Sequence, residues 1–306
     1  MRIFFILLIT LLLSGCEFWF DNFTKQGEMA IYLSSSPRAE LSDVTLTITQ
    51  IEVQHSAGQW HTLNVESNIH QNNLQHLSPS QPLLIAQQNN LPEGEYTRLR
   101  VSFNTPAGEA MARDSGGTFA LYAANTLSVD ITPRFNINKD QKRDLLATLD
   151  FQHALAEYED DSERYYRLET QALRITPRNM SYIYGDITDT AWQPLDCNEV
   201  TFSDNNERLG SYVYVYQDKQ QELDKLTDLQ LNNDQAPIAT AAVVANESDS
   251  SKQQYRFSSL PEGDYIVALT CHGERDHPNA RNDDVLTSVG QKLSITGTNN
   301  QRINFN

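Results

Sequence analysis

The hexapeptides Leu91-Pro-Glu-Gly-Glu-Tyr96 and Leu260-Pro-Glu-Gly-Asp-Tyr265 are nearly identical, and each leads into an apolar stretch. Proline fixes φ and glycine permits a positive φ, so each copy predicts a turn that enters a strand. We expect the glycine of each copy to have a positive φ and the tyrosine to be buried at the start of the strand. Two copies in a chain of 306 residues predict one β-sandwich in each half.

Apolar and polar residues alternate along most of the chain, which is typical of strands with one buried face. Strands are expected at residues 44–48, 51–53, 60–63, 96–103, 127–131, 145–151, 166–175, 182–187, 212–216, 236–244, 255–257, 265–271, 293–295 and 303–305. The run 51–53 is out of phase with 44–48 by one residue, which predicts a bulge. Residues 222–231 are compatible with one short helix.

The fold class is therefore predicted to be all-β, with two tandem β-sandwiches that are Ig-like or transthyretin-like. Pro177 and Asn179 separate a first domain at residues 27–177 from a second at 181–306. The chain holds 23 Lys and Arg against 40 Asp and Glu, a net charge of −17. Nucleic acid is not an expected partner, because phosphate binding needs a basic patch and the sequence has none.

The chain begins MRIFFILLITLLLSGC. Arg2 precedes an apolar run at residues 3–13, which is too short to span about 30 Å of hydrocarbon as a helix. A basic start, a short apolar stretch and small residues are typical of a secretory signal peptide. We expect residues 1–15 to be removed on export.

The end of this segment, Leu13-Ser14-Gly15-Cys16, resembles the bacterial lipobox. The resemblance implies that Cys16 carries a diacylglyceryl thioether and an acylated amine, so palmitate is expected on the protein. An ordinary signal peptide with a coincidental cysteine is the alternative. Glu17 is not the Asp that favours inner-membrane retention, which favours the outer membrane. Residues 16–26 would form a lipidated tether, whose aromatic side chains either meet the lipid headgroups or pack on the first domain.

Two cysteines remain, Cys197 and Cys271. An exported chain enters an oxidising compartment, and two thiols left over from the anchor predict one disulfide. The alternatives are two free buried thiols, or a metal site that uses Cys271 and His272.

Several stretches of the first half resemble the bacterial lipoprotein domain of unknown function 4382 over about residues 27–177. They are residues 29–37, 44–53, Trp60, 91–101, Leu149-Asp150-Phe151 and 166–175. Ser35 and Ser36 stand where such domains usually carry an Asp. The resemblance implies no established activity.

The second half is similar to transthyretin-like or carboxypeptidase-regulatory-like β-sandwiches, which share a carbohydrate-binding-like fold. The residues that carry this likeness are Gly185, residues 212–216 and residues 260–270. Fold alone does not give function.

No catalytic residue is predicted. Asp114-Ser115-Gly116-Gly117 resembles part of the nucleophile motif of trypsin-like proteases, but Arg113 and Thr118 stand where a Gly and a Pro belong. A Gly-rich hairpin turn is the expected structure. Acyl-transfer elbows and phosphate-cradling loops are missing from the sequence, so we expect no enzyme activity and no cofactor.

Glu157, Glu159, Asp160, Asp161 and Glu163 form an acidic run. Carboxylates so close can hold Ca²⁺, but the alternation and central Gly of an EF-hand are missing. A solvated loop between strands is favoured, and calcium is left open.

The loop with His272, Asp276 and His277 lacks a recognised zinc spacing. No metal site is predicted there.

Trp192, Tyr212, Tyr214 and Tyr216 offer a ligand face if the three tyrosines are exposed, since aromatic rings suit sugars. Core or edge packing of the tyrosines is favoured. The predicted function is a non-enzymatic, lipid-anchored protein of the cell envelope, facing the periplasm or the surface, that binds or scaffolds. Its expected partners are the membrane, through the lipid, and a glycan or an envelope protein. A carbohydrate-binding module is the alternative.

Overall fold

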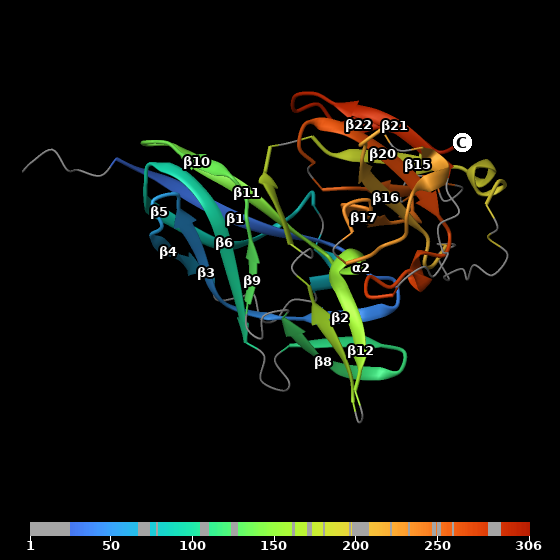
Figure 1. The fold of residues 1–306 in the computed structure, drawn as a ribbon, viewed down its shortest axis with the longest axis horizontal. Coiled ribbons are helices and arrows are strands. Elements are labelled where there is room, and N and C mark those ends of the chain that lie inside the picture. The colour runs from blue at the N-terminus through green and yellow to red at the C-terminus, as the bar shows by residue number, and fades with distance from the viewer. Residues whose placement is uncertain are drawn as a thin grey trace, which may run out of the picture.

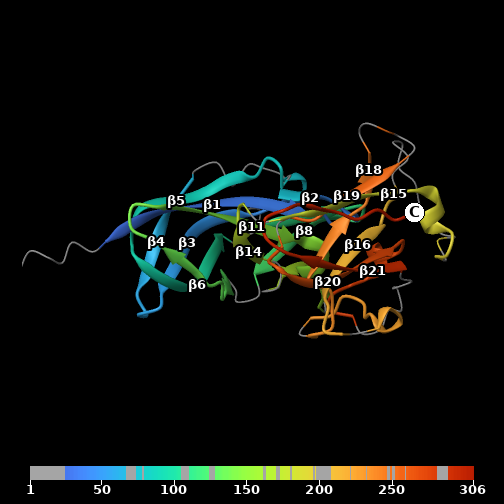
Figure 2. The ribbon, with the colours of Figure 1, turned by 90° about the horizontal axis from the view of Figure 1, so that it is seen from above.

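The residues that the structure describes fold into four β-sheets arranged as two pairs. A computed structural model describes residues 25–66, 74–77, 79–104, 110–123, 128–160, 163–169, 173–179, 181–195, 197, 208–220, 222–231, 233–246, 249, 252–258, 260–280 and 289–306. The strands of the first pair of sheets all lie before residue 178, and those of the second pair all lie after residue 182. The two halves lie one after the other along the long axis, with the C-terminus at the far end (Figures 1 and 2).

The first half packs a large sheet against a smaller one. The large sheet holds, in spatial order, β10 (Phe135–Ile137), β6 (Gly94–Asn104), β3 (Thr47–His55), β4 (Trp60–Val65), β5 (Leu83–Pro92), β1 (Gln26–Ser36), β11 (Lys142–Asp150) and β14 (Leu173–Pro177), and β9 (Ser128–Ile131) also pairs with β6. The smaller sheet holds β12 (Leu155–Glu159), β13 (Arg164–Leu168), β8 (Gly117–Ala123), β7 (Met111–Asp114) and β2 (Leu41–Thr45). A single-turn helix, α2 (Phe151–Ala154), joins the sheets between β11 and β12.

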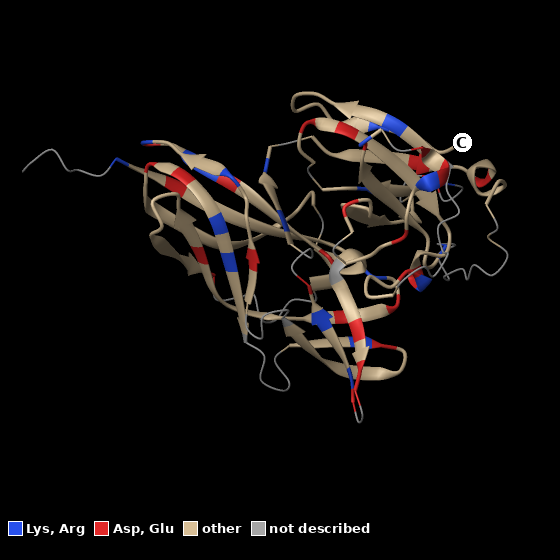
Figure 3. Ribbon diagram, viewed as in Figure 1, with Lys and Arg blue, Asp and Glu red and all other residues tan. Residues whose placement is uncertain are grey.

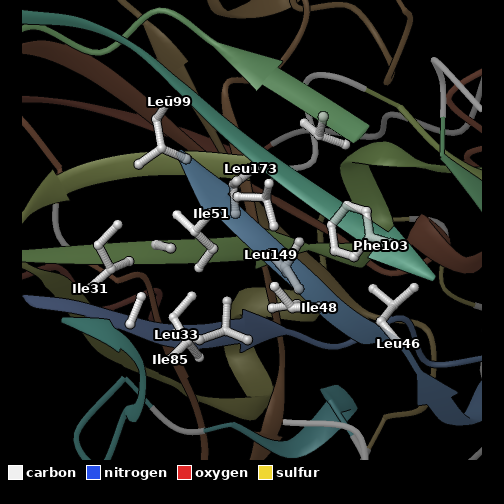
Figure 4. Packing of buried hydrophobic residues seen from close by; sticks show 14 of the residues in the cluster. Ile31, Leu33, Leu46, Ile48, Ile51, Ile85, Leu99, Phe103, Leu149 and Leu173 are labelled. Atoms are coloured by element: carbon white, nitrogen blue, oxygen red, sulfur yellow. The ribbon is translucent and has the colours of Figure 1, made fainter. Parts of the chain in front are cut away.

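The core of the first half draws on strands from both ends of its sequence. Figure 4 shows side chains of β1, β3, β6 and β11 gathered there, among them Ile31, Leu33, Ile48, Ile51, Leu99, Phe103 and Leu149. Burial of each such side chain contributes about 1.5–3 kcal/mol. Long-range apolar packing therefore holds this half together.

The phase change at residues 44–53 has two structural causes. Leu46 lies between β2 and β3, where the chain passes from the smaller sheet to the larger one. The pairing of β3 with β6 then shifts register between Ile48 and Gln50. The predicted bulge is confirmed.

The second half consists of two four-stranded sheets in the described part of the chain. One holds β18 (Val244–Ala245), β19 (Gln253–Arg256), β15 (Ile183–Ile187) and β22 (Gln301–Arg302), and the other holds β17 (Ala239–Ala242), β16 (Tyr212–Gln217), β20 (Gly263–Thr270) and β21 (Val289–Ile295). Val213, Val215 and Val267 face the core between these sheets. The predicted all-β class is confirmed.

Several details differ from the sequence prediction. Residues 236–244 were expected as one strand but contain β17 and the start of β18, which belong to different sheets. Residues 166–175 were expected as one strand but form β13 and β14, which belong to different sheets. The proposed helix at 222–231 is limited to the 3-10 turn Leu223–Lys225.

Both hexapeptide turns have the predicted form. Gly94 has φ +145° and Gly263 has φ +158°. Tyr96 is fully buried, and Tyr265 is 4% exposed. Each tyrosine hydroxyl donates to a carbonyl four residues upstream, Tyr96 to Pro92 O at 3.0 Å and Tyr265 to Pro261 O at 2.9 Å. This bond fastens each turn to the strand that it begins.

Candidate functional site

The contact between the two halves is built from buried polar side chains. Strands β1 and β11 are parallel and in register, so Ser36 and Asp150 lie opposite one another at the same end of the sheet. Both reach Thr240 at the other side of the contact. Asp150 accepts hydrogen bonds from Thr240 N (2.6 Å) and Thr240 Oγ1 (2.7 Å), and Ser36 Oγ donates to Thr240 O (2.8 Å).

Asp150 also begins α2, where its Oδ1 accepts from His153 N at 3.1 Å. Its side chain is only 3% exposed. A buried carboxylate is stable only when its oxygens are hydrogen-bonded. Asp150 therefore depends on the second half, since two of its three bonds come from Thr240.

A row of hydroxyl groups extends the contact beside Asp150. Thr148 Oγ1 donates to Ser258 Oγ at 2.8 Å, and Arg174 Nη2 donates to the same oxygen at 2.7 Å. Ser34 Oγ lies 3.1 Å from Thr148 Oγ1. Because a hydroxyl has one proton and that of Thr148 points to Ser258, Ser34 is the donor in this last bond. The hydrogen bonds of the row thus run in one direction, from Ser34 to Thr148 and from Thr148 to Ser258.

Helix α2 provides the next group, Gln152, which is fully buried. Its Nε2 donates to Gly273 O at 2.6 Å and to Asp276 O at 2.9 Å. The carboxylate of Asp276 accepts from Tyr214 Oη at 2.8 Å and from Leu229 N at 3.0 Å. The network therefore runs from α2 into the sheet of the second half, and Figure 1 places α2 beside β17.

Arg38 is a fully buried cation at the same contact. Its Nη2 lies 2.7 Å from Glu40 Oε2 and 3.0 Å from His277 Nδ1 in the second half. The next backbone amide, Ala39 N, donates to Tyr212 Oη at 2.6 Å. A buried charge needs a paired partner, and Glu40 provides it.

The three tyrosines are packed inside the molecule, as the sequence favoured, so the ligand face that exposed tyrosines would form with Trp192 is not present. Tyr212, Tyr214 and Tyr216 are all fully buried, and Trp192 is 4% exposed. The valine face of β16 packs in the sandwich core, while the tyrosine face is covered by Leu229 and its neighbours and by the first half. Burial raises the pKa of the Tyr214 hydroxyl well above its usual value, and Asp276 raises it further. Tyr212 bonds to the first half, whereas Tyr214 bonds to Asp276 and Tyr216 to Thr227 O within the second half.

The predicted disulfide between Cys197 and Cys271 is confirmed, with Cα atoms 5.8 Å apart. Cys271 is therefore not a thiolate metal ligand. His272 Nδ1 instead lies 3.9 Å from Glu274 Oε1. The described residues include no group of three or more His, Cys, Asp or Glu that could hold a metal ion.

The acidic run and the Gly-rich turn meet at one arginine. Arg164 pairs with Glu157 at 2.5 Å and also with Asp114, which accepts from Tyr166 Oη at 2.8 Å. Asp114 Oδ1 accepts from Gly116 N at 2.6 Å, as expected of a hairpin turn between β7 and β8. Figure 3 shows acidic and basic positions distributed over both halves. Asp161 lies outside the described residues.

The signal peptide, Cys16 and most of the tether also lie outside the described residues. In the part of the chain that is described, we find no helix with the length and apolarity needed to cross a membrane.

Sequence reasoning missed the polar contact, although one signal was present. Asp150 interrupts the apolar run 145–151, and a carboxylate at a buried strand end must find partners. Its main partner, Thr240, lies 90 residues away, and nothing local points to it. The segment with Ser35 and Ser36 likewise contributes to the contact, through Ser36.

Comparison with known proteins supports a family for the first half. The family model described as "Domain of unknown function (DUF4382)" matches residues 26–169. No curated protein sequence matches the chain. The family assignment therefore rests on the first half and carries no named activity.

Solved structures resemble the chain only distantly. The TIE protein of Bacillus anthracis is 13% identical with a TM-score of 0.21, and the match covers 92% of this chain and 33% of that one. A candidate cell adhesion protein of Bacteroides fragilis is 8% identical with a TM-score of 0.22, with coverage of 90% and 92%. The minor pilin GBS52 of Streptococcus agalactiae is 12% identical with a TM-score of 0.19, with coverage of 91% and 94%. The chain thus spans about a third of the TIE protein's length.

Proposed function

We propose that this chain is a lipid-anchored, non-enzymatic protein of the bacterial cell envelope with a binding or scaffolding role. The N-terminal signal and the lipobox-like Leu13-Ser14-Gly15-Cys16 support the anchor, and Glu17 supports the outer membrane. Three acyl chains would make release from the membrane negligible, since two already hold a protein firmly. The second half is, in this proposal, a transthyretin-like module.

The observation that carries the scaffolding role is the network of buried hydrogen bonds at the contact. Domains of one chain move relative to one another by default, unless the interface between them is large and apolar. Here the contact is polar, the carboxylate of Asp150 is satisfied by Thr240 and His153 N, and Gln152 Nε2 donates to two carbonyls, so the loss of a partner would leave a buried polar group unpaired. The two sandwiches therefore behave as one rigid body that projects from the membrane.

Spin labels placed on each half test this rigidity. Ala57→Cys and Thr296→Cys lie at exposed positions of the two halves in the chain with Cys16 replaced by Ala. Pulsed electron resonance should give one narrow distance distribution. Thr240→Val, which removes one of the two bonds to Asp150, should broaden it. A broad distribution in the parent protein would refute the rigid body.

The anchor has its own test. Cells fed a palmitate analogue should label the wild-type protein and leave Cys16→Ala unlabelled and released from the outer membrane fraction. Ser14→Ala is a matched control, because it leaves the acylated cysteine in place. Equal labelling of the Cys16→Ala protein would overturn the lipid anchor without affecting the rigidity result.

A further inference from the structure

A cavity of about 510 Å³ opens at the contact between the halves. Its walls come from both: His153 and Arg174 from the first half, and Lys219, Gln230 and Ile238 from the second. The volume lies within the range of about 300–1,000 Å³ that is typical of small-molecule sites. The cavity exists only because the two halves are held together.

Arg174 brings a positive charge to this cavity, and its hydrogen bonds among the described residues go to neutral acceptors, Ile238 O and Ser258 Oγ. Its Nη2 donates to Ser258 Oγ, its Nη1 makes a long 3.4 Å bond to Ile238 O, and its Nε is buried with no hydrogen-bond partner. Asp150 is the acid whose charge acts on Arg174. Its carboxylate oxygens already accept hydrogen bonds from Thr240 and from the backbone amide of His153. A guanidinium stays protonated in proteins, so the charge is available to a ligand.

Lys219 adds a second positive charge at the rim. Its Nζ donates to the backbone carbonyl of Asp234 at 2.9 Å, which is a neutral acceptor. The carboxylate of Asp234 is the one acidic group among the residues that line the cavity. Two cations against one carboxylate make the cavity locally positive, although the whole chain has a net charge of −17.

His153 offers a further polar atom to a ligand. The side chain is 9% exposed, and its Nδ1 is buried without a hydrogen-bond partner. Burial lowers the pKa of the ring, with Asp150 opposing and Arg174 reinforcing the shift, so the ring is neutral at pH 7. A neutral ring can donate one hydrogen bond from Nδ1 to an oxygen in the cavity. A buried polar atom left unpaired is costly unless a ligand satisfies it.

Leu173, Pro237 and Ile238 form the aliphatic part of the lining, which also includes the neutral polar residues Gln230 and Asn233. A lining that combines two cationic side chains with aliphatic ones suits a molecule with an anionic head and a carbon body. We propose that this cavity binds a small organic carboxylate, with the carboxylate at Arg174 and Lys219 and the body against the aliphatic wall. This inference deepens the binding role proposed above and rests on it.

Calorimetry on the whole chain carrying Cys16→Ala tests the site with two probes, hexanoate and glucuronate. Binding of hexanoate alone would identify an aliphatic acid, and binding of glucuronate alone a sugar acid. Hexanamide and glucose should not bind, because they lack the charge. Failure of both carboxylates at millimolar concentration would overturn the proposal, as would equal binding of the neutral analogues.

Variants locate the site. Lys219→Gln, at an exposed position that poses no folding problem, should weaken carboxylate binding by about tenfold or more, which matches one charge-assisted hydrogen bond. Arg174→Gln should abolish it. Lys225→Gln, which removes a lysine paired with Glu222 outside the cavity, is the matched control and should change nothing. Unchanged affinity in Lys219→Gln and Arg174→Gln would refute the site.

The imidazole of His153 gives a readout that does not depend on affinity. Its Nδ1 nitrogen resonance should shift when the carboxylate is added, and that of His76, outside the cavity, should not. A shift of neither resonance despite binding would place the ligand elsewhere and refute the site. Membrane labelling and spin-label distances do not depend on this result, so failure of the site is distinguishable from failure of the proposed function.

Discussion

The turns before β6 and β20 share five of six residues but have different surroundings. In both, glycine takes a positive φ and the tyrosine hydroxyl bonds back to a proline carbonyl. Around the first turn, the ring of Tyr96 packs against Phe135 at 5.6 Å and against His55 at 5.2 Å. Around the second, the side chain of Tyr265 lies in the core of the second half. Burial raises the pKa of its hydroxyl, and the charge of Arg174 from the first half opposes that rise.

The glycines differ in the same way. A Cβ on Gly94 would overlap His55 Nε2, whereas on Gly263 the nearest atom would be Tyr265 Oη at 3.4 Å. The local sequence therefore determines the backbone and the hydrogen bond, and residues from other strands determine what a substitution costs. The same contrast extends to the halves, since the one disulfide in the described part of the chain lies in the second.

Removal of that disulfide should have the largest effect. Replacing Cys197 and Cys271 with Ser should cost the second half about 2–5 kcal/mol, because it frees a long loop in the unfolded chain. Hydrogen exchange of the whole chain should speed up in β16 and β20 and stay unchanged in β3 and β6. Chemical reduction of the wild type is the control and should reproduce the pattern. Equal acceleration in both halves would contradict an effect centred on the half that holds the disulfide.

The glycines come next. Gly94→Val and Gly263→Val should each destabilise their own half by about 1–3 kcal/mol, because a side chain at such a φ is strained. Gly94→Val should cost more, since His55 must also move.

Gly58→Val separates the two contributions. Gly58 has φ +95° with nothing near its missing Cβ, so this variant reports backbone strain alone. Urea unfolding should rank Gly94→Val as the most destabilising of the three. If Gly263→Val lowers the free energy of unfolding as much as Gly94→Val does, the overlap with His55 does not add to the cost.

These turns were predictable because their information is local: a proline, a glycine and a tyrosine within six residues. The disulfide was predictable because the sequence predicts export and holds two cysteines besides Cys16. The polar contact was not, since Asp150 and Thr240 are joined only by the tertiary fold. The burial of Tyr214 was ambiguous for the same reason, because alternation shows that the two faces of a strand differ but not that both are covered.

Loss of the tyrosine hydroxyls should have a smaller and equal effect. Tyr96→Phe and Tyr265→Phe each remove one hydrogen bond and leave a proline carbonyl without its partner, at a cost of about 1 kcal/mol. Tyr122→Phe, at a residue 41% exposed, should cost almost nothing. Urea unfolding measures all three. A clear difference between Tyr96→Phe and Tyr265→Phe would show that the shared bond is not equivalent in the two turns.

Acid should have the smallest of these effects, a loss of folding stability through the histidine beside the first turn. His61 packs on Tyr96 with 6.0 Å between the ring centroids. Burial lowers the pKa of His61, and His55 lowers it further. The unfolded chain therefore binds a proton at His61 below about pH 6.5 more readily than the folded chain does, so stability falls as the pH drops through that value. At pH 6 this linkage costs at most about 0.8 kcal/mol, which is the limit for a group of pKa 6.5 kept neutral by folding.

Burial also lowers the pKa of His153, so the measurement must compare the pH-dependent loss of stability in two proteins that differ only at His61. Urea unfolding at pH 7 and pH 6 should show a smaller loss of stability for His61→Gln than for the parent protein. Identical losses in the parent and His61→Gln would mean that the ring beside Tyr96 does not couple the first turn to pH.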